Sequence, residues 1–503
     1  MTERVAIIEL GSNSARLIIM HIYYNGAYNL VYHQKETIRL SEGMDSDEEL
    51  KAPAMARAIK AMETFAHMCK LFKVDHIIGV STAAIRNARN GESFRDQIEK
   101  HCGIRLDIIS GDAEAQTGFV GVINTIEITD GLLFDLGAAS TEITLIKDRK
   151  AHKVISLPFG GVNLTERFKL NDTIQGDQLT KLIAFIQSEL RRVPWLRNLN
   201  VPLIGVGGTA RNIAKIDQKR KNYPFPKVHN YRLGRIAVDR IWADLTKTSL
   251  LQRRKMPGLS SERADIIVAG TTLIKCLFET AGSDQLIISG CGVREGLFFR
   301  HYLTRNGCQE LIPNILMHSS HNMLGFYKGD IPHAYKVADL AEAMFDGWQD
   351  LINFGPREKS LLRVAALLHD IGITVNYYDH ARHSAYLVEN ARLFGLTHRE
   401  QMLTAVIAGW HNGPISRFSR HIYSLFLDEL DWQIATKLSL LVALAESLDS
   451  TQLGHVKSVQ TSMQGKQAIL RIITEYAASI EREEILKHRK WFKKVFGIDL
   501  VIV

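Results

Sequence analysis

An internal repeat constrains the fold of this chain more than any other feature of its sequence. Residues 5–14 read VAIIELGSNS, an apolar run followed by an acid, a glycine and small hydroxyl residues, and residues 132–140 read LLFDLGAAS. Each copy is followed by a second β-rich run, a polar turn and a third run, with Asn25-Gly26 as a strong hairpin signal in the first turn. Two duplicated β-meanders, each followed by helical segments, predict a pair of related α/β lobes that face one another.

Two further segments have the same form of an apolar run that ends on glycines. The run at 203–206 leads into Gly207-Gly208-Thr209, and the run at 286–289 leads into Gly290-Cys291-Gly292. Each predicts a strand followed by a helix whose free N–H groups stabilise an anion, with Thr209 as the expected cap of the first of these helices. Four such turns, each at the end of an expected strand, are stronger evidence than any one of them.

The 503 residues are too many for one core, so several domains are expected. We expect α/β lobe I over residues 1–125 and lobe II over 126–306. After about residue 306 the sequence changes to long amphipathic helices rich in histidine, which predicts an all-α domain over 307–455. The last stretch, 456–503, is expected to form a small α+β cap of strands and a charged helix.

Composition narrows the cellular setting. Hydrophobic residues make up 46% and charged residues 23%, which are values of globular proteins. The five cysteines form no CxxC pair, so neither a disulfide framework nor a thiolate zinc site is expected. There is no signal-peptide pattern and no run of roughly 20 apolar residues. We therefore expect a cytoplasmic protein without a membrane partner.

Positive charge is concentrated in one stretch. The formal net charge is +8, yet residues 211–255 alone carry 13 Lys or Arg against three Asp. This stretch either captures polyanions or forms a solvated helix face, and the sequence favours neither interpretation.

The two repeated turns have the chemistry of phosphate binding. Ser12, Asn13 and Ser14 offer hydroxyl, amide and N–H donors, and the turn Gly137–Ser140 offers similar donors from the other lobe. Glu9, Asp135 and Glu142 lie beside these turns and are suitable ligands for Mg²⁺, directly or through water. Arg86, in the segment STAAIR, suits a bidentate phosphate contact.

A third carboxylate group lies between the two copies. Residues 108–115 read IISGDAEA, an expected strand, turn and helix start that carries Asp112 and Glu114. A purely local interpretation is that Asp112 caps the helix and Glu114 complements its dipole.

These motifs together resemble the exopolyphosphatase/guanosine pentaphosphate phosphatase (Ppx/GppA) family of the sugar kinase, Hsp70 and actin superfamily. The motifs are ELGSNS at 9–14, STAAIR at 81–86, ISGDAEA at 109–115, FDLGAASTE at 134–142, FGGVN at 159–163 and GVGGT at 205–209. The resemblance implies two actin-like, ribonuclease H-like lobes and Glu114 as the general base. It also implies that Asp135 and Glu142 help to place the metal, and that the two turns and Arg86 hold the terminal phosphates, with Gly207, Gly208 and Thr209 as a further phosphate-binding turn.

The sequence departs from the family pattern at the turns. The family has Asp at the position of Glu9, GGGS at the position of Gly137-Ala138-Ala139-Ser140, and commonly Glu at the position of Ala113. Because a Cβ penalises positive φ, Ala138 and Ala139 are expected to reshape or crowd the phosphate turn. These departures leave open a weakly catalytic or non-catalytic protein that only binds phosphate chains or guanosine nucleotides.

The helical segment resembles the HD metal-dependent phosphohydrolase superfamily. Its His369-Asp370 pair follows an amphipathic helix, and imidazole and carboxylate side chains together bind divalent ions. The resemblance implies a metal site of His333, His369, Asp370 and an acid near Glu446, with His383 and His411 as ligands of a second ion. His380 and Asp449 are further candidates in the same region.

The leading hypothesis is an exopolyphosphatase that releases terminal orthophosphate from inorganic polyphosphate with Mg²⁺ or Mn²⁺; whether potassium takes part cannot be read from the sequence. The alternatives are a guanosine pentaphosphate 5′-phosphohydrolase and a non-catalytic sensor. No specific nucleic acid is expected as a partner, and the resemblance favours a homodimer.

Overall fold

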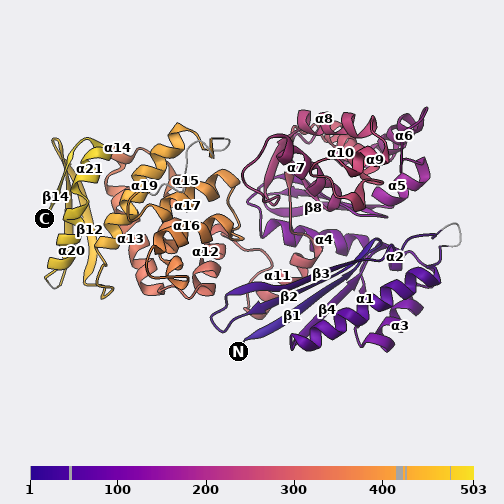
Figure 1. The fold of residues 1–503 in the computed structure, drawn as a ribbon, viewed down its shortest axis with the longest axis horizontal. Coiled ribbons are helices and arrows are strands. Elements are labelled where there is room, and N and C mark those ends of the chain that lie inside the picture. The colour runs from indigo at the N-terminus through magenta and orange to yellow at the C-terminus, as the bar shows by residue number, and fades with distance from the viewer. Residues whose placement is uncertain (1, 45–47, 415–422, 425–426, 476) are drawn as a thin grey trace. The chain divides into compact units, whose positions relative to one another are not determined.

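The computed structural model describes residues 2–44, 48–414, 423–424, 427–475 and 477–503. The chain divides into two compact units (Figure 1). The first unit runs to Tyr24 and from Tyr28 to Pro313, and the second contains Asn25–Ala27 and Asn314–Val503. The division at 313/314 lies a few residues after the expected end of lobe II at 306. The described helices include none that is long and apolar enough to cross a membrane.

The first unit begins with a five-stranded sheet in the order β3-β2-β1-β4-β5. Strands β1 and β2 and strands β2 and β3 pair antiparallel, whereas β4 and β5 continue the sheet in parallel. The polar turn after β2 contains Gly26 at φ 82°, which glycine adopts at little cost, so the predicted hairpin is confirmed. The elements are β1 (Glu3–Leu10), β2 (Ser14–Ile22), β3 (Tyr28–Thr37), α1 (Ala52–Leu71), β4 (His76–Ser81), α2 (Ala83–Arg86), α3 (Gly91–Cys102), β5 (Asp107–Ile108) and α4 (Gly111–Ile123).

A second sheet repeats this topology in the order β10-β11-β9-β6-β7-β8. Its antiparallel strands β6, β7 and β8 correspond to β1, β2 and β3, and the parallel β9 and β11 correspond to β4 and β5. Asp148 and Arg149, between β7 and β8, both have positive φ, as a two-residue hairpin turn requires. The predicted duplication is therefore confirmed. The strands are β6 (Gly131–Leu136), β7 (Thr141–Lys147), β8 (Lys150–Leu157), β9 (Leu203–Val206), β10 (Tyr231–Gly234) and β11 (Gln285–Ile288).

A shared core joins the two lobes. Helices α4 and α11 pack against each other, and their apolar side chains form one buried cluster with residues of both sheets, including Ile7 of β1 and Leu133 of β6. Each lobe also has its own cluster on the other face of its sheet. Because both sheets are fixed on the same helix pair, their loop ends are held in a defined arrangement. The helices of lobe II are α5 (Gly161–Phe168), α6 (Gln178–Arg191), α7 (Gly208–Arg220), α8 (Arg235–Thr246), α9 (Leu250–Arg254), α10 (Ile267–Ala281) and α11 (Val293–Arg305).

The second unit is mainly helical, as expected. Helices α13, α15, α17 and α19 pack on one another, and a short 3-10 turn, Ile371–Thr374, follows α15. A three-stranded sheet, β12-β13-β14, packs on α13 and belongs to the same compact unit. The elements are α12 (Ile315–Phe326), α13 (Ile331–Gly347), α14 (Gln349–Ile352), α15 (Pro356–Leu368), α16 (His380–Asn390), α17 (His398–Gly409), α19 (Glu429–Ser447), β12 (Val456–Gln464), β13 (Gln467–Thr474), α20 (Ser479–Lys487), α21 (Arg489–Phe496) and β14 (Asp499–Ile502).

Candidate functional site

The two repeated turns line one pocket of the first unit. They have the same backbone hydrogen bond, because N–H of Gly11 donates to O of Ser14 and N–H of Gly137 donates to O of Ser140, both at 3.1 Å. The duplication therefore extends from the strand order to the shape of the loops. Of the expected phosphate-binding residues, those that line the pocket are Ser12, Asn13, Ser14, Gly137, Ala138, Ser140, Gly207, Gly208 and Thr209, whereas Ala139 and Arg86 do not line it.

The alanines of the second turn do not distort it. Neither Ala138 nor Ala139 has a positive φ, so the expected strain from their Cβ atoms is absent from this turn. The carbonyl groups of both point toward the start of α5, where O of Ala138 accepts from N–H of Val162 at 2.9 Å. Gly160 permits this close approach, since a Cβ there would lie 2.6 Å from O of Gly137. The expectation that Ala138 and Ala139 would reshape the backbone of this turn was therefore wrong. Crowding of the pocket by their Cβ atoms stays a prediction.

The start of α7 forms another wall of the pocket. Gly207, at φ 99°, is the residue before the helix, so Thr209 does not cap it as expected. A Cβ on Gly208 would overlap the guanidinium of Arg263, which therefore lies directly over the first turn of the helix. The free N–H groups of this turn and the guanidinium together provide an anion-binding surface.

Two carboxylates project from neighbouring strands into the pocket. Asp135 of β6 and Glu142 of β7 are cross-strand partners, and residues paired in this way point to the same face of a sheet. Ser156 donates a hydrogen bond of 2.9 Å to Glu142. Burial, followed by the charges of Glu142 and Glu9, raises the pKa of Asp135 to about 7. Burial also raises the pKa of Glu142, although hydrogen bonds from Ser140 and Ser156 oppose the rise. A cation between these two side chains would relieve their repulsion.

Glu9 has different partners from those expected of a metal ligand. Its Oε2 lies 3.3 Å from Nε of Arg294 and 3.7 Å from Nη1 of Arg16. Among the described residues, Glu9, Asp135 and Glu142 do not form a group whose ligand atoms lie within 4.8 Å of one another. The expectation that these three acids hold Mg²⁺, directly or through water, stays a prediction, and in the structure Glu9 contacts Arg16 and Arg294.

Glu114 lies in the first turn of α4 and lines the same pocket. The cap of this helix is Ser110, whose Oγ accepts from N–H of Ala113, so the local interpretation with Asp112 as cap was wrong. Nη1 of Arg86 donates to Oε2 of Glu114 at 2.9 Å and to O of Ile109 at 2.9 Å, so Arg86 orients Glu114 rather than lining the pocket. Burial and the charge of Glu142 raise the pKa of Glu114 well above its usual value, and Arg86 opposes this.

Four arginines of the pocket were not assigned from the sequence. The side chains of Arg16 and Arg294 are less than one-fifth exposed. Burial, with the charges of Arg16 and Arg211, lowers the pKa of Arg263 to about 10. Arginines that crowd one another in a half-buried pocket indicate a site for an anion. Arg16 follows the first repeated turn and Arg294 follows the fourth glycine turn, so both had a signal in the sequence, but nothing in the sequence singled out Arg263. The four are Arg16, Arg211, Arg263 and Arg294.

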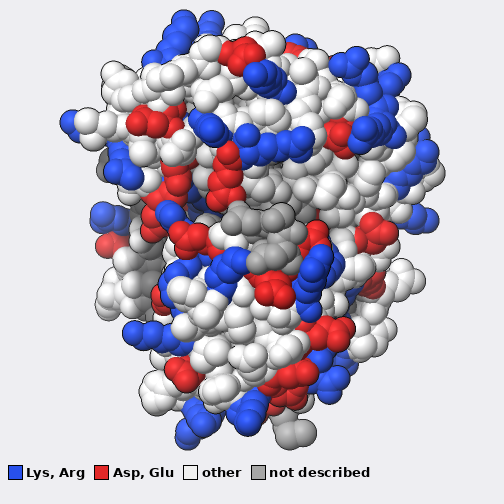
Figure 2. Space-filling model, turned by 90° about the vertical axis from the view of Figure 1, so that its right-hand side faces the viewer, with Lys and Arg blue, Asp and Glu red and all other residues white. Residues whose placement is uncertain are grey.

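The basic stretch 211–255 contributes one of these arginines and little else to the pocket. Arg211 is its only member among the described lining residues. Arg220 pairs with Asp244 at 2.8 Å, and Lys221 pairs with Asp217 at 2.8 Å. On the face drawn in Figure 2, Lys and Arg side chains alternate with Asp and Glu rather than forming one continuous patch. The structure thus favours the interpretation of this stretch as mostly solvated helix faces.

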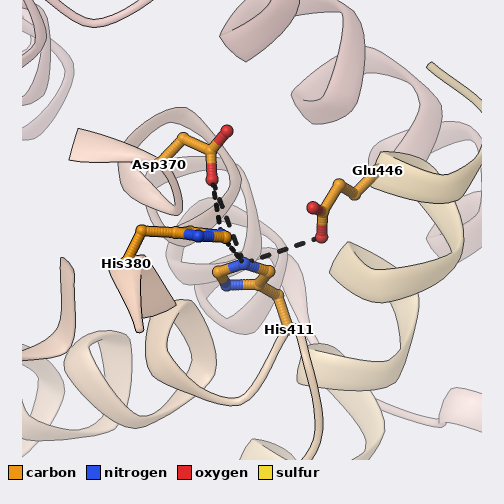
Figure 3. Close-up of side chains that lie close together, drawn as sticks. All are labelled: Asp370, His380, His411 and Glu446. Atoms are coloured by element: carbon orange, nitrogen blue, oxygen red, sulfur yellow. Dashed lines mark hydrogen bonds and ion pairs between the residues drawn. The ribbon is translucent and has the colours of Figure 1, made fainter. Parts of the chain in front are cut away.

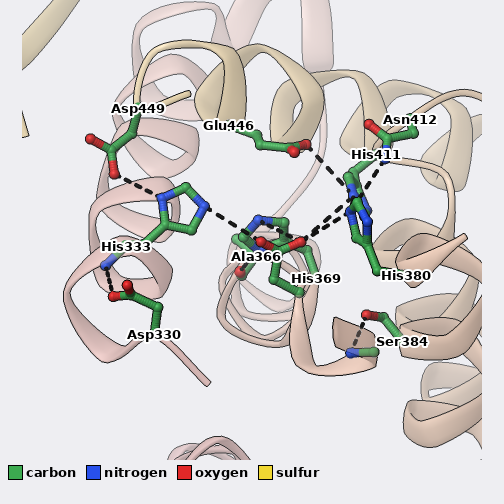
Figure 4. Close-up of polar contacts among 12 residues, drawn as sticks. Asp330, His333, Ala366, His369, His380, Ser384, His411, Asn412, Glu446 and Asp449 are labelled. Carbon is green, nitrogen blue, oxygen red and sulfur yellow. Dashed lines mark hydrogen bonds and ion pairs between the residues drawn. The ribbon is translucent and has the colours of Figure 1, made fainter. Parts of the chain in front are cut away.

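The histidines of the second unit converge as a separate cluster (Figure 3). Two groups of residues have potential ligand atoms that, within each group, all lie within 4.8 Å of one another. One group contains His333, His369 and Asp370, and the other contains Asp370, His380, His411 and Glu446 (Figure 4). His383, expected as a ligand, belongs to neither group, and His380 takes its place. The two residues are separated by three positions on α16, so the helix presents them in related directions and only the tertiary structure selects one.

Fold and pocket together define a two-lobed α/β protein in which two duplicated loops and a group of arginines line one pocket. A model of the Ppx/GppA phosphatase family matches residues 19–305, and a model of Ppx/GppA phosphatase domain III matches residues 315–488. The chain therefore belongs to the Ppx/GppA phosphatase family and is a hydrolase acting on phosphoric anhydrides. The match to domain III does not test the HD-type relationship, which stays a prediction.

Individual relatives agree with this assignment. The chain is 27% identical over 415 residues to guanosine-5′-triphosphate,3′-diphosphate pyrophosphatase of Aeromonas salmonicida (strain A449), covering 80% of this chain and 79% of the relative. The crystal structure of the Aquifex aeolicus Ppx/GppA family member has a TM-score of 0.54 and 27% identity, covering 61% of this chain and 99% of that one. An exopolyphosphatase from Cytophaga hutchinsonii shares the fold, with a TM-score of 0.56, 23% identity, and coverage of 62% and 100%.

Proposed function

We propose that this chain releases terminal orthophosphate from inorganic polyphosphate, with Glu114 as the general base. The observation that carries the proposal is the position of Glu114, a buried carboxylate with a raised pKa on the wall of a pocket that also contains two phosphate loops and four arginines. A base whose pKa lies nearer to neutrality accepts a proton more effectively during reaction. Phosphoryl transfer otherwise needs positioning and charge neutralisation, which the loops and arginines supply.

In the proposed reaction, the oxygen of a water molecule forms a bond to the terminal phosphorus while the bond from phosphorus to the bridging oxygen breaks. Glu114 takes the proton of the water, and Arg86 holds the carboxylate in place through its 2.9 Å hydrogen bond. The N–H and hydroxyl groups of the loops at Ser12 and Ser140 bind the oxygens of the terminal phosphate, and the arginines bind the following phosphates.

The carboxylates of Asp135 and Glu142 fit a divalent cation. They are cross-strand neighbours whose pKa values burial raises, which is the environment that a bound cation stabilises. Mg²⁺ commonly takes one or two carboxylates and completes its coordination with water and substrate phosphates. When bound there, Mg²⁺ would neutralise charge on the phosphoryl group.

The lining of the pocket supports an inorganic chain as the substrate. Among the described residues that line it there is no aromatic side chain, so none of them can stack on a base. A neighbouring pocket shares Asn13 and Ile266 with the first, and its described lining also lacks aromatic residues.

Guanosine pentaphosphate is the second candidate substrate. The names of the curated relatives that cover about 80% of this chain favour it, since three of them are guanosine-5′-triphosphate,3′-diphosphate pyrophosphatases. The non-catalytic sensor finds less support, because the altered Ala138-Ala139 turn keeps the backbone hydrogen bond of the first loop.

The decisive experiment measures phosphate release from polyphosphates of several lengths and from guanosine pentaphosphate, for the wild type and for Glu114→Gln. We expect the wild type to release phosphate faster from polyphosphate than from guanosine pentaphosphate. We also expect kcat to fall roughly 100-fold or more in Glu114→Gln, with substrate binding retained. Asp112→Asn is the matched control, because Asp112 is an exposed carboxylate in the same helical turn and does not line the pocket. Preference for guanosine pentaphosphate would transfer the proposal to the second candidate, and equal rates for wild type and Glu114→Gln would remove Glu114 from the mechanism.

A further inference from the structure

The fourth glycine turn, residues 290–292, lines the pocket of the first unit but engages its three N–H groups within the protein. The sequence predicts that N–H groups here bind an anion, whereas each of these three has a protein acceptor. Gly290 donates to Nδ1 of His229 at 3.1 Å, Cys291 donates to Oγ of Ser289 at 3.1 Å, and Gly292 donates to Oε2 of Glu295 at 2.9 Å. The charged group that the turn offers to a phosphate is therefore the side chain of Arg294, which follows it and lines the same pocket.

Backbone pairing brings His229 to this turn. Strands β10 and β11 are antiparallel, with Tyr231 opposite Ile288, so the residues just before Tyr231 lie beside those just after Ile288. The N–H of Asn230 donates to O of Ile288 at 2.7 Å. Asn230 has φ 60°, a conformation that asparagine adopts more readily than most residues. Main-chain contacts thus place His229 beside Gly290.

The two nitrogens of the His229 ring have opposite roles. Nε2 lies 3.3 Å from O of Thr125, and because a carbonyl oxygen can only accept, Nε2 carries the proton. Nδ1 then has the lone pair that accepts from the N–H of Gly290. The ring therefore joins the fourth glycine turn to the segment directly after α4, the helix that has Glu114 in its first turn.

The fourth glycine turn is packed tightly against its neighbours. A Cβ on Gly121 of α4 would lie 2.1 Å from O of Gly292, so the two backbones are in direct contact. A Cβ on Gly292 would lie 3.7 Å from Oδ2 of Asp135. Because close packing leaves no free space to absorb a displacement, a shift of the turn at Gly290 would move the start of α11 and with it Arg294.

Arg294 depends on this placement for its contact with a ligand. It lies in the first turn of α11, and its Nε is 3.3 Å from Oε2 of Glu9. Its side chain is less than one-fifth exposed. A guanidinium binds phosphate oxygens through N–H groups that point in fixed directions, so the strength of binding depends on where the backbone holds it.

We propose that His229 is a positioning residue for phosphate binding. By accepting the N–H of Gly290, it holds the fourth glycine turn, and thereby Arg294, where the guanidinium binds the phosphates of the substrate. His229 is not among the described residues that line the pocket, so it acts through the turn and does not touch the substrate. The inference rests on the proposed function only in the choice of polyphosphate as substrate, because phosphate binding is measured without hydrolysis.

Two substitutions separate the hydrogen bond from the bulk of the ring. His229→Asn keeps an acceptor, because Oδ1 of asparagine takes a place similar to that of Nδ1, whereas His229→Leu removes it. Calorimetry of the full chain measures binding of imidodiphosphate, a diphosphate analogue whose bridging nitrogen resists hydrolysis, and initial rates on polyphosphate give kcat and KM. For His229→Leu we expect roughly tenfold weaker binding and a roughly tenfold higher KM, with kcat changed less than about threefold, as loss of one hydrogen bond predicts. His229→Asn should stay within about threefold of the wild type.

A double-mutant cycle tests whether His229 acts through Arg294. Arg294→Gln removes the guanidinium, so adding His229→Leu to it should weaken imidodiphosphate binding by less than about twofold more. Effects that multiply in the double variant would overturn the proposal. Binding by a folded His229→Leu variant equal to that of the wild type would also overturn it, as would a His229→Asn variant as weak as His229→Leu.

His301→Leu is the matched control, because His301 is a partly buried histidine of α11 whose Nε2 contacts Oε1 of Glu3 at 2.6 Å rather than the turn. It should bind imidodiphosphate as the wild type does, and thermal melting verifies the fold of every variant.

A second measurement does not depend on the folding of His229→Leu. NMR of the wild type with nitrogen-labelled histidines should show the proton of the His229 ring on Nε2, in a signal identified by its loss in His229→Asn, and a proton on Nδ1 would overturn the proposal. A wild type that binds imidodiphosphate but does not hydrolyse polyphosphate would contradict the proposed function alone. A folded wild type that does not bind imidodiphosphate would overturn the role of His229.

Discussion

Replacing Asp135 by asparagine is expected to stabilise the metal-free protein while it abolishes hydrolysis. Asp135 is half-buried in the pocket, and burial, Glu142 and Glu9 raise its pKa to about 7 from a usual value of 3.8. A carboxyl whose pKa is raised by folding favours the folded state fully below pH 3.8. That contribution is lost as the pH rises to about 7. The wild type therefore tolerates an unfavourable charge at neutral pH, and asparagine removes it.

The size of this effect follows from the two pKa values. At about 1.4 kcal/mol per pH unit, the interval between 3.8 and about 7 corresponds to at most roughly 4.5 kcal/mol of unfolding free energy. Water in the pocket screens the charge, so we expect roughly 2–4 kcal/mol. The gain should grow between pH 5 and 7 and level off above pH 7. Saturating Mg²⁺ should stabilise the wild type more than the variant, which reduces the difference.

Hydrogen exchange of peptides from β6 and β7, corrected for intrinsic rates, measures the stability difference between Asp135→Asn and the wild type locally. The measurement is independent of the second unit. Asp130→Asn is the control, because Asp130 is an exposed acid directly before β6. A stability difference that does not change with pH, or an Asp135→Asn variant less stable than the wild type at pH 8 without metal, would refute the reasoning.

Three further changes test the geometry of the pocket. Arg86→Gln removes a charge that lowers the pKa of Glu114, so the acidic limb of the kcat–pH profile should move to higher pH; an unchanged limb would contradict the contact. Gly160→Ala places a Cβ 2.6 Å from O of Gly137, so we expect a free energy of unfolding roughly 1–3 kcal/mol lower and a lower kcat/KM. Unchanged kinetics and an unchanged melting temperature would show that the turn accommodates the Cβ without cost. Ala138→Gly should change kcat/KM only a few-fold because φ at Ala138 is not positive, and a gain of about tenfold or more would reveal crowding by the Cβ.

Local patterns in the sequence predicted the framework of the first unit. The echo of apolar run, acid, glycine and serine identified two β-meanders, and each became three antiparallel strands followed by parallel ones. The same pattern identified the loops around Ser12 and Ser140 as parts of one pocket. This succeeded because strand period, turn residues and helix starts are properties of a few consecutive residues. Glu114 was identified by resemblance to a family motif, and the structure places it in the same pocket.

The sequence alone determined that the first unit contains two glycine turns of the same kind and that a helical segment is rich in histidines and acids. Only the tertiary structure decided that Glu9 pairs with Arg16 and Arg294, and that Arg86 binds Glu114. It also selected His380 over His383. These outcomes depend on which side chains from distant segments come within a few ångströms of each other. Strand order and helix packing fix those distances, and residue type and spacing do not.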